Sequence, residues 1–199
     1  MEVNADISTW LRRRRILRIG AWSLLLVILV SVILDHTRAF GYSGSDLRRF
    51  DHQPVTVTRA IDGDTISVRI DGEEAETTVH LLGVDTPELP AAHWAERAAK
   101  YTSSRTVGRT VTLRLDPIGW RNDRGELLAY IFITDADNLN LDLIRDGQGY
   151  ADRRAGHSLH ASFAAAEKEA RQKQRGLWKD VTDEQQPAWR KAWLKSRGY

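Results

Sequence analysis

The sequence predicts an α+β protein in which five strands form a small β-barrel, with about three helices attached and one apolar N-terminal segment before them. From Pro54 onward, apolar and polar residues alternate with a period of two, which is typical of half-buried strands. Three later segments instead space their apolar residues as a helix does. The 199 residues suit one domain of ordinary size with additional segments, and the hydrophobic fraction of 42% is sufficient for a core.

The N-terminal segment combines a basic stretch, residues 1–18, with an uncharged run at 19–34. A helix rises about 1.5 Å per residue, so this run spans roughly 24 Å. A bilayer core is about 30 Å thick, a gap that Trp22 and the flanking arginines can bridge by snorkelling. We therefore predict a transmembrane anchor at residues 19–35, with the N-terminus cytoplasmic and the following domain extracytoplasmic, that is periplasmic or extracellular.

Two other interpretations of this segment remain open. A basic region before an apolar run is also typical of a signal peptide, and residues 13–18 resemble a twin-arginine export signal. If residues 1–39 are cleaved, the protein is secreted. Residues 36–53 contain several glycines and serines and are predicted to be a linker.

The strands and helices are expected in a fixed order along the chain. The first hairpin joins strands around Val55 and Ile66 to Ile70, and the pair Asp71-Gly72 predicts the turn to the next strand. The remaining strands are expected at 77–84, 110–115 and 127–133, and the helices at 89–107, 140–147 and 159–175. Glycines at 147 and 176 predict the ends of the last two helices. This order indicates a barrel with helices attached.

The C-terminal tail, residues 181–199, places Trp189 and Trp193 among basic residues. Such a segment could contact lipid headgroups or a nucleic-acid backbone. It could also be a short helix that docks its tryptophans on the barrel, which is the interpretation we favour.

Composition excludes some chemistry. Cysteine is absent, so disulfides, thiolate metal sites and cysteine nucleophiles are ruled out. The formal net charge of +2 gives no overall positive field for nucleic acid.

Carboxylates gather in two short motifs, Asp62-Gly-Asp64 and Asp85-Thr-Pro-Glu88. Clustered carboxylates repel one another unless a cation lies between them, and calcium prefers several oxygen ligands. The motifs therefore predict a divalent-cation site. The alternative is that the first motif is a simple turn and the second a helix start.

Five sequence blocks resemble the thermonuclease family, the staphylococcal-nuclease-like domains, in family order and spacing. The blocks are Ala60–Thr65, Leu81–Glu88, Leu128–Ile131, Leu143–Gly147 and Ala165–Trp178. The resemblance covers residues 54–180. It implies an OB-fold barrel and a calcium-dependent phosphodiesterase acting on DNA and RNA, in which water attacks phosphorus and the 5′-oxygen leaves.

The acidic half of the family site is present in this chain. Asp64 and Asp85 match the two aspartates that bind Ca²⁺, and Thr86 matches the residue that offers a backbone carbonyl. Glu88 matches the residue that activates or orients the attacking water.

The cationic half differs from the family pattern, which has two arginines that grip the phosphoryl oxygens. Their positions hold His80 and Glu126. Histidine is a cation only part of the time near neutral pH, and a glutamate repels phosphate. Arg121 and Arg124 are the candidate substitute cations.

The base-binding wall of the family also differs, because Arg153 and Arg154 occupy the neighbourhood of its tyrosines and Tyr150 lies earlier. Arginines can stack on bases and contact phosphate. The alternative is a solvated loop.

These observations predict a membrane-anchored, calcium-dependent nuclease, weakened by the loss of both arginines, with nucleic acid as substrate. Residues 19–34 would contact the membrane, and no protein partner is predicted. The alternative is an inactive OB-fold module that binds nucleic acid or a partner protein at the cell envelope.

Overall fold

The computed structural model describes residues 22–23, 26–27, 29–30, 44–88, 91–117, 119–154 and 156–196. The chain divides into two units, Met1–Ser43 and Gly44–Tyr199. Most of the expected anchor at 19–35, the basic segment at 1–18 and residues 36–43 lie outside the described residues. Within the described ranges, no helix is both long and apolar enough to cross a membrane.

Five strands of the second unit close into a barrel, as the alternating pattern predicts. Neighbouring strands follow the order β3, β2, β1, β5, β6, and a parallel pairing between β3 and β6 closes the ring. This arrangement is consistent with an OB-fold. The barrel strands are β1 (Pro54–Ala60), β2 (Thr65–Ile70), β3 (Glu76–Leu81), β5 (Thr110–Arg114) and β6 (Leu127–Thr134).

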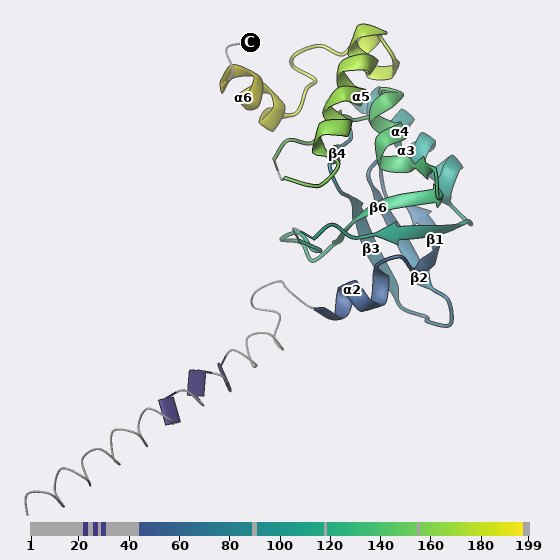
Figure 1. Ribbon diagram of the computed structural model, residues 1–199. Coiled ribbons are helices and arrows are strands. Elements are labelled where there is room, and N and C mark those ends of the chain that lie inside the picture. Colours follow the sequence, from purple (N-terminus) through teal and green to yellow (C-terminus); the bar gives the residue numbers. More distant parts are fainter. Residues whose placement is uncertain are drawn as a thin grey trace, which may run out of the picture. The chain divides into compact units, whose positions relative to one another are not determined.

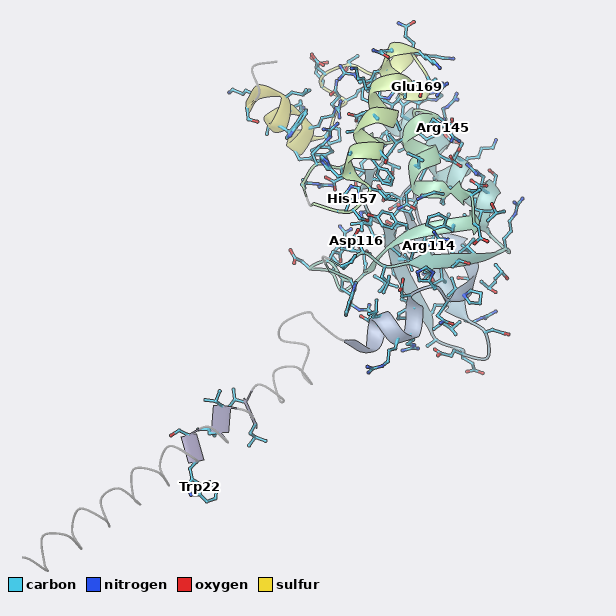
Figure 2. The ribbon with its side chains drawn as sticks, in the orientation of Figure 1. Trp22, Arg114, Asp116, Arg145, His157 and Glu169 are labelled. Carbon is cyan, nitrogen blue, oxygen red and sulfur yellow. The ribbon has the colours of Figure 1, made fainter. Side chains whose placement is uncertain are left out.

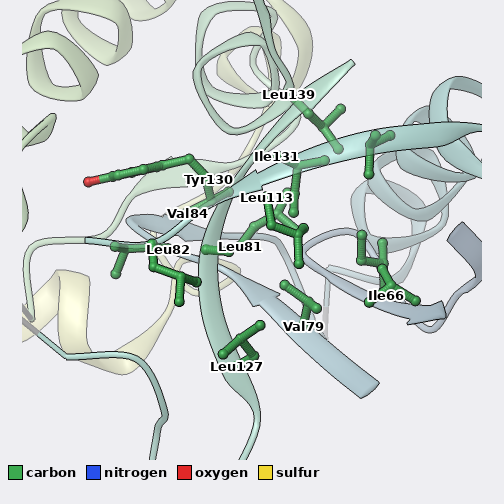
Figure 3. Packing of buried hydrophobic residues seen from close by; sticks show 14 of the residues in the cluster. Ile66, Val79, Leu81, Leu82, Val84, Leu113, Leu127, Tyr130, Ile131 and Leu139 are labelled. Carbon is green, nitrogen blue, oxygen red and sulfur yellow. The ribbon is translucent and has the colours of Figure 1, made fainter. Parts of the chain in front are cut away.

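The barrel interior is filled by the apolar members of these alternating strands. Val57, Ile66 and Val79 are each 0% exposed, because every second side chain of a strand points inward. Figure 3 shows the cluster, with Leu81, Leu113 and Ile131 packed together and the Tyr130 hydroxyl pointing away from it.

Three helices match the expected segments. They are α3 (Ala92–Thr106), α4 (Leu139–Arg145) and α5 (His160–Gln172), followed by the 3₁₀ turn η1 (Gly176–Lys179). Helix α3 packs against β1, and α4 packs between β6 and α5. Figure 1 shows the three helices gathered on one side of the barrel, with α2 at the other side.

The predicted linker is wrong from residue 44 onward, because Gly44–Phe50 form helix α2. Such a short helix lacks a strong periodic signal, and tertiary contacts stabilise it instead. Phe50 is 1% exposed in the core, and Asp46 accepts hydrogen bonds from Arg121.

A buried asparagine fixes the connection that carries the second acidic motif. The Asn140 side-chain oxygen accepts from the Ile131 amide at 2.9 Å, and its nitrogen donates to the Leu82 and Ala129 carbonyls at 3.0 and 3.1 Å. Asn140 lies in the first turn of α4, which follows the short strand β7 (Asp137–Asn138). The bonds therefore tie α4 and the residues after β3 to β6.

A second apolar cluster joins the tail to the acidic motif. The two-residue strands β4 (Val84–Asp85) and β8 (Tyr150–Ala151) pair antiparallel, with Asp85 opposite Tyr150. Tyr150 and Leu177 belong to a buried cluster against which Trp189 of α6 (Ala188–Ser196) packs. The structure thus places the tail in the docked arrangement.

Candidate functional site

The first acidic motif is a tight turn between β1 and β2 that packs beneath α3. The Asp62 carboxylate accepts from the Asp64 amide at 3.0 Å, and the Gly63 carbonyl accepts from the Thr102 hydroxyl at 2.5 Å. A Cβ atom on Gly63 would lie 2.6 Å from the Thr86 hydroxyl oxygen and 2.7 Å from the Ala98 Cβ. Only glycine therefore allows the turn to approach the second acidic motif this closely.

Asp64 is held by the second motif. Its Oδ2 accepts from the Thr86 amide at 2.6 Å and from the Thr86 hydroxyl at 3.0 Å, while Oδ1 accepts from the Thr65 hydroxyl at 3.2 Å. Because Thr86 directly follows Asp85, these bonds bring the two predicted metal-binding aspartates together.

The electrostatics of Asp64 favour neutralisation by a cation. Burial raises its pKa from 3.8 to about 8, and the charges of Asp62 and Asp85 add to the rise against the opposing bonds from Thr86. Burial also raises the pKa of Asp85. The turn therefore concentrates negative charge where water cannot solvate it well, as is usual for metal-binding sites.

Both carboxylate oxygens of Asp85 already have partners in this structure. Oδ1 accepts from the Arg154 guanidinium at 2.5 Å, and Oδ2 accepts from the Trp189 indole at 3.0 Å. The Arg154 guanidinium also lies 5.1 Å from the Trp189 ring centroid and binds Asp152. Asp85 thus forms a salt bridge with Arg154.

His80 lies beside Asp64 in a partly buried position that disfavours its charged form. Its Nδ1 is 3.5 Å from Asp64 Oδ1 and 3.2 Å from the Thr65 hydroxyl, because His80 pairs with Thr65 across β2 and β3. Burial lowers the pKa of His80 despite the opposing charge of Glu126. Burial therefore favours the neutral form of the imidazole.

The two candidate substitute arginines point to different partners. Arg121 binds Asp46 at 2.6 and 3.0 Å and is turned toward α2. Arg124 is exposed and binds Glu126 at 2.8 Å, and the charge of Asp64 contributes to raising its pKa after that of Glu126. Arg124 is therefore close enough to interact electrostatically with Asp64, whereas Arg121 binds α2 to the barrel.

The expected base-binding residues are also separated. Tyr150 is fully buried, with the Arg190 guanidinium 5.1 Å from its ring centroid, so stacking on a base would require this cover to move. Arg153 binds Glu167 at 3.3 Å and lies over Trp193. Arg154 reaches the acidic motif through its side chain, whereas Tyr150 lies opposite Asp85 through strand pairing.

Glu88 is exposed on the surface after Thr86. In the ranges that the structure describes, no three side chains among histidine, aspartate and glutamate converge as a metal-ligand set. The residues Asp64 and Asp85, with the Thr86 carbonyl, suit calcium in type and charge. In this structure the Asp85 oxygens are occupied by Arg154 and Trp189.

A polar network positions the loop that carries Arg154. The Tyr130 hydroxyl lies 2.9 Å from both an Asp116 oxygen and the His157 Nδ1, and Asp116 also accepts from the Ser158 amide at 2.8 Å. Figure 2 shows Asp116 and His157 next to each other where the barrel meets α5. The network fixes the loop between β8 and α5 relative to β6.

Sequence reasoning missed the contribution of Trp189 to this site. Its position, 104 residues after Asp85, carries no local signal for the contact. Only its proximity to basic residues marked the tail as a binding segment.

Residues 78–180 match the family model described as staphylococcal nuclease homologue. The chain is similar to the thermonuclease of Staphylococcus intermedius, with 28% identity over 162 residues that cover 78% of this chain and 92% of the relative. It is 30% identical over 128 residues to a protein of Escherichia coli O157:H7 named uncharacterized endonuclease, covering 63% of this chain and 76% of the relative. It is 35% identical over 98 residues to endonuclease YncB of Bacillus subtilis strain 168, covering 47% and 45%.

Proposed function

The chain belongs to the staphylococcal nuclease family, and from this membership we propose that it is a calcium-dependent phosphodiesterase that cleaves DNA or RNA slowly. The observation that carries the proposal is the contact between the acidic motifs, in which Asp64 accepts two hydrogen bonds from the residue after Asp85. The resulting concentration of buried negative charge is what a divalent cation neutralises.

Asp64, Asp85 and the Thr86 carbonyl would hold calcium. When bound, calcium supplies a Lewis acid that polarises a phosphoryl oxygen and offsets charge developing on it. The chain contributes the position of the two aspartates, set by the Thr86 bonds and by the close approach of Gly63.

Glu88 would orient the attacking water in this proposal. It follows the Thr86-Pro87 pair and is exposed, so solvent and substrate have access to its carboxylate. A positioned carboxylate acting as general base contributes typically about 10²–10⁴-fold to a rate.

Slow cleavage follows from the missing cations. Burial lowers the pKa of His80 and so favours its neutral form, and Glu126 is an anion that binds Arg124. Removing one transition-state donor costs about 10²–10³ in kcat, so two missing guanidinium groups leave a small rate.

We further propose that residues 19–35 anchor the protein in a membrane, with the nuclease-like domain outside the cytoplasm. The uncharged run between arginines and Asp35 supports this. In sealed cells, an external protease should digest an epitope placed at the C-terminus while leaving one at the N-terminus intact. Protection of the C-terminal epitope would contradict the proposed orientation.

The nuclease assay compares the full-length protein with its Glu88→Gln variant on single-stranded DNA, in calcium and in chelator. Cleavage that requires calcium and falls at least about tenfold in the variant is the expected result. Cleavage equal in both proteins would mean that the activity comes from a contaminant, and the proposal would be rejected.

A second variant, His80→Arg with Glu126→Arg, tests the reason for slow cleavage. Restoring two guanidinium groups should raise kcat by on the order of 10²-fold or more. An unchanged rate would show that another cation already does this work.

The second candidate function is a non-cleaving module that binds nucleic acid or a partner protein. The observation that favours it is the pairing of Asp85 with Arg154 and Trp189, which leaves both oxygens engaged. Calorimetry that detects polynucleotide binding with no hydrolysis in calcium would support this module over the enzyme.

A further inference from the structure

The C-terminal helix α6 reaches the acidic site through one bond. The Trp189 indole donates to Asp85 Oδ2 at 3.0 Å, while the Arg154 guanidinium donates to Oδ1 at 2.5 Å. The two groups also contact each other, since the guanidinium lies over the indole ring. A metal-binding carboxylate is thus covered by a cation and an N–H donor, both from the chain itself.

Helix α6 is anchored independently of the acidic site. Arg190, next to Trp189, is 1% exposed and binds Glu167 of α5 at 2.7 Å. Its guanidinium also lies 5.1 and 5.0 Å from the ring centroids of Tyr150 and Trp178. Helix α6 is therefore held by several contacts besides the bond between Trp189 and Asp85.

Arg154 is held more loosely than α6. Its side chain is 50% exposed, and it binds Asp152 at 2.9 Å as well as Asp85. It can therefore leave Asp85 without losing all of its hydrogen-bond partners. A divalent cation on Asp85 would repel the guanidinium at this distance and take the oxygen that it occupies.

We propose that Trp189 of α6 and Arg154 form a cap on Asp85 that competes with the divalent cation for this carboxylate. The inference rests on the proposed calcium-dependent function. Cation binding releases Arg154 from Asp85 while Asp152 and the Trp189 ring keep it near the site. The released guanidinium then binds the substrate phosphate, which His80 and Glu126 cannot do.

The test measures calcium affinity by calorimetry on the full-length protein and on three single variants. Trp189→Phe keeps the ring and removes the N–H donor, whereas Arg154→Gln removes the cation at a half-exposed position. Trp178→Phe is the matched control, because its indole nitrogen is buried in the same region without a hydrogen-bond partner. Truncating α6 is avoided, since the loss of Arg190 would take the closest cation from the buried Glu167.

The cap predicts a calcium association constant raised about fivefold or more by Trp189→Phe and about tenfold by Arg154→Gln, with Trp178→Phe within about twofold of the parent. At saturating calcium, Arg154→Gln should also cleave single-stranded DNA at least about tenfold more slowly. The opposite directions of affinity and rate separate the cap from a merely structural role.

If the parent binds calcium and cleaves DNA, but neither Trp189→Phe nor Arg154→Gln raises the affinity, the cap is refuted and the proposed function stands. Undiminished cleavage by Arg154→Gln at saturating calcium would overturn its role at the phosphate. If no protein of the set binds calcium, the proposed function fails and the cap fails with it.

Discussion

Replacing Asp64 with asparagine should stabilise the metal-free protein at neutral pH. The folded state raises the pKa of this carboxyl from 3.8 to about 8, chiefly by burial. At pH values between 3.8 and about 8, the folded protein binds the Asp64 proton more tightly than the unfolded chain does. The free energy of unfolding therefore falls as the pH rises through this window, and the full contribution is present only below the lower value.

The magnitude follows from the size of the shift. One pKa unit corresponds to about 1.4 kcal/mol, and pH 7 lies about three units above the unfolded-state pKa. Taking up a proton on Asp64 when the chain folds at pH 7 therefore costs roughly 4 kcal/mol of unfolding free energy. Asparagine removes the charge and keeps an oxygen that can accept from the Thr86 amide and hydroxyl. Because bonds to a neutral amide are weaker than bonds to a carboxylate, we expect a net gain of about 2–4 kcal/mol.

Urea and thermal unfolding in chelator measure this gain. For a domain of this size, the midpoint temperature should rise by about 5–15 °C at pH 7. Near pH 4 the gain should largely disappear, because the unfolded chain then also binds the proton and folding no longer has to take one up. Asp62→Asn is the control, since it removes an exposed charge that adds to the shift, and its gain should be smaller.

The electrostatic reasoning would be wrong if Asp64→Asn were no more stable than the parent at pH 7. A gain of equal size at pH 4 and pH 7 would also refute it, because the effect would then not depend on ionisation. Calorimetry should show weaker calcium binding by this variant if Asp64 is a ligand.

Three further predictions concern the fold. Burial lowers the pKa of His157, so its contribution to stability is full above the ordinary value of 6.5 and is lost as the pH falls below it. His157→Gln should therefore lose less unfolding free energy than the parent between pH 7 and pH 5 in urea titrations, and parallel losses would contradict this. Arg190→Met leaves Glu167 buried without its closest cation and should cost about 3–5 kcal/mol in urea unfolding. Adding Glu167→Gln should recover part of the loss. If Arg190→Met alone left the free energy of unfolding unchanged, the anchoring role of the pair would be refuted. Gly147→Ala should cost about 2–4 kcal/mol, because φ is +66° and the new Cβ would lie 2.2 Å from a backbone oxygen. Gly72→Ala, with positive φ but open space, is the control, and equal losses for both variants would show that crowding is unimportant.

Local patterns predicted most of the barrel and its helices. Period-two alternation identified β2 because Ile66 and Val68 face the core, and the glycine at 147 does end α4. Helix α2 was not predicted, since its stability comes from Phe50 in the core and from the bond between Asp46 and Arg121. Asp46 and Arg121 are 75 positions apart in the sequence, so no local pattern predicts their contact.

The candidate site was also predicted only in part from the sequence. The order of the acidic motifs predicted that Asp64 and Asp85 would meet, and the structure joins them through Thr86. The comparison with the family pattern also showed that His80 and Glu126 stand where the family has its two arginines. Sequence reasoning did not find that Arg154 and Trp189 would hold Asp85, because arginine and tryptophan in a loop and a tail have many possible partners.

The sequence by itself placed two acidic motifs and the glutamate after them at short spacing, and its resemblance to the family predicted their roles and marked His80 and Glu126 at the positions of two arginines. These properties depend on residue type and short spacing, which the chain carries locally. Only the tertiary structure decided the electrostatic state of the site, because burial sets the pKa of Asp64 and the packing of α6 brings Trp189 to Asp85. Both depend on which distant segments exclude water from the acidic pair.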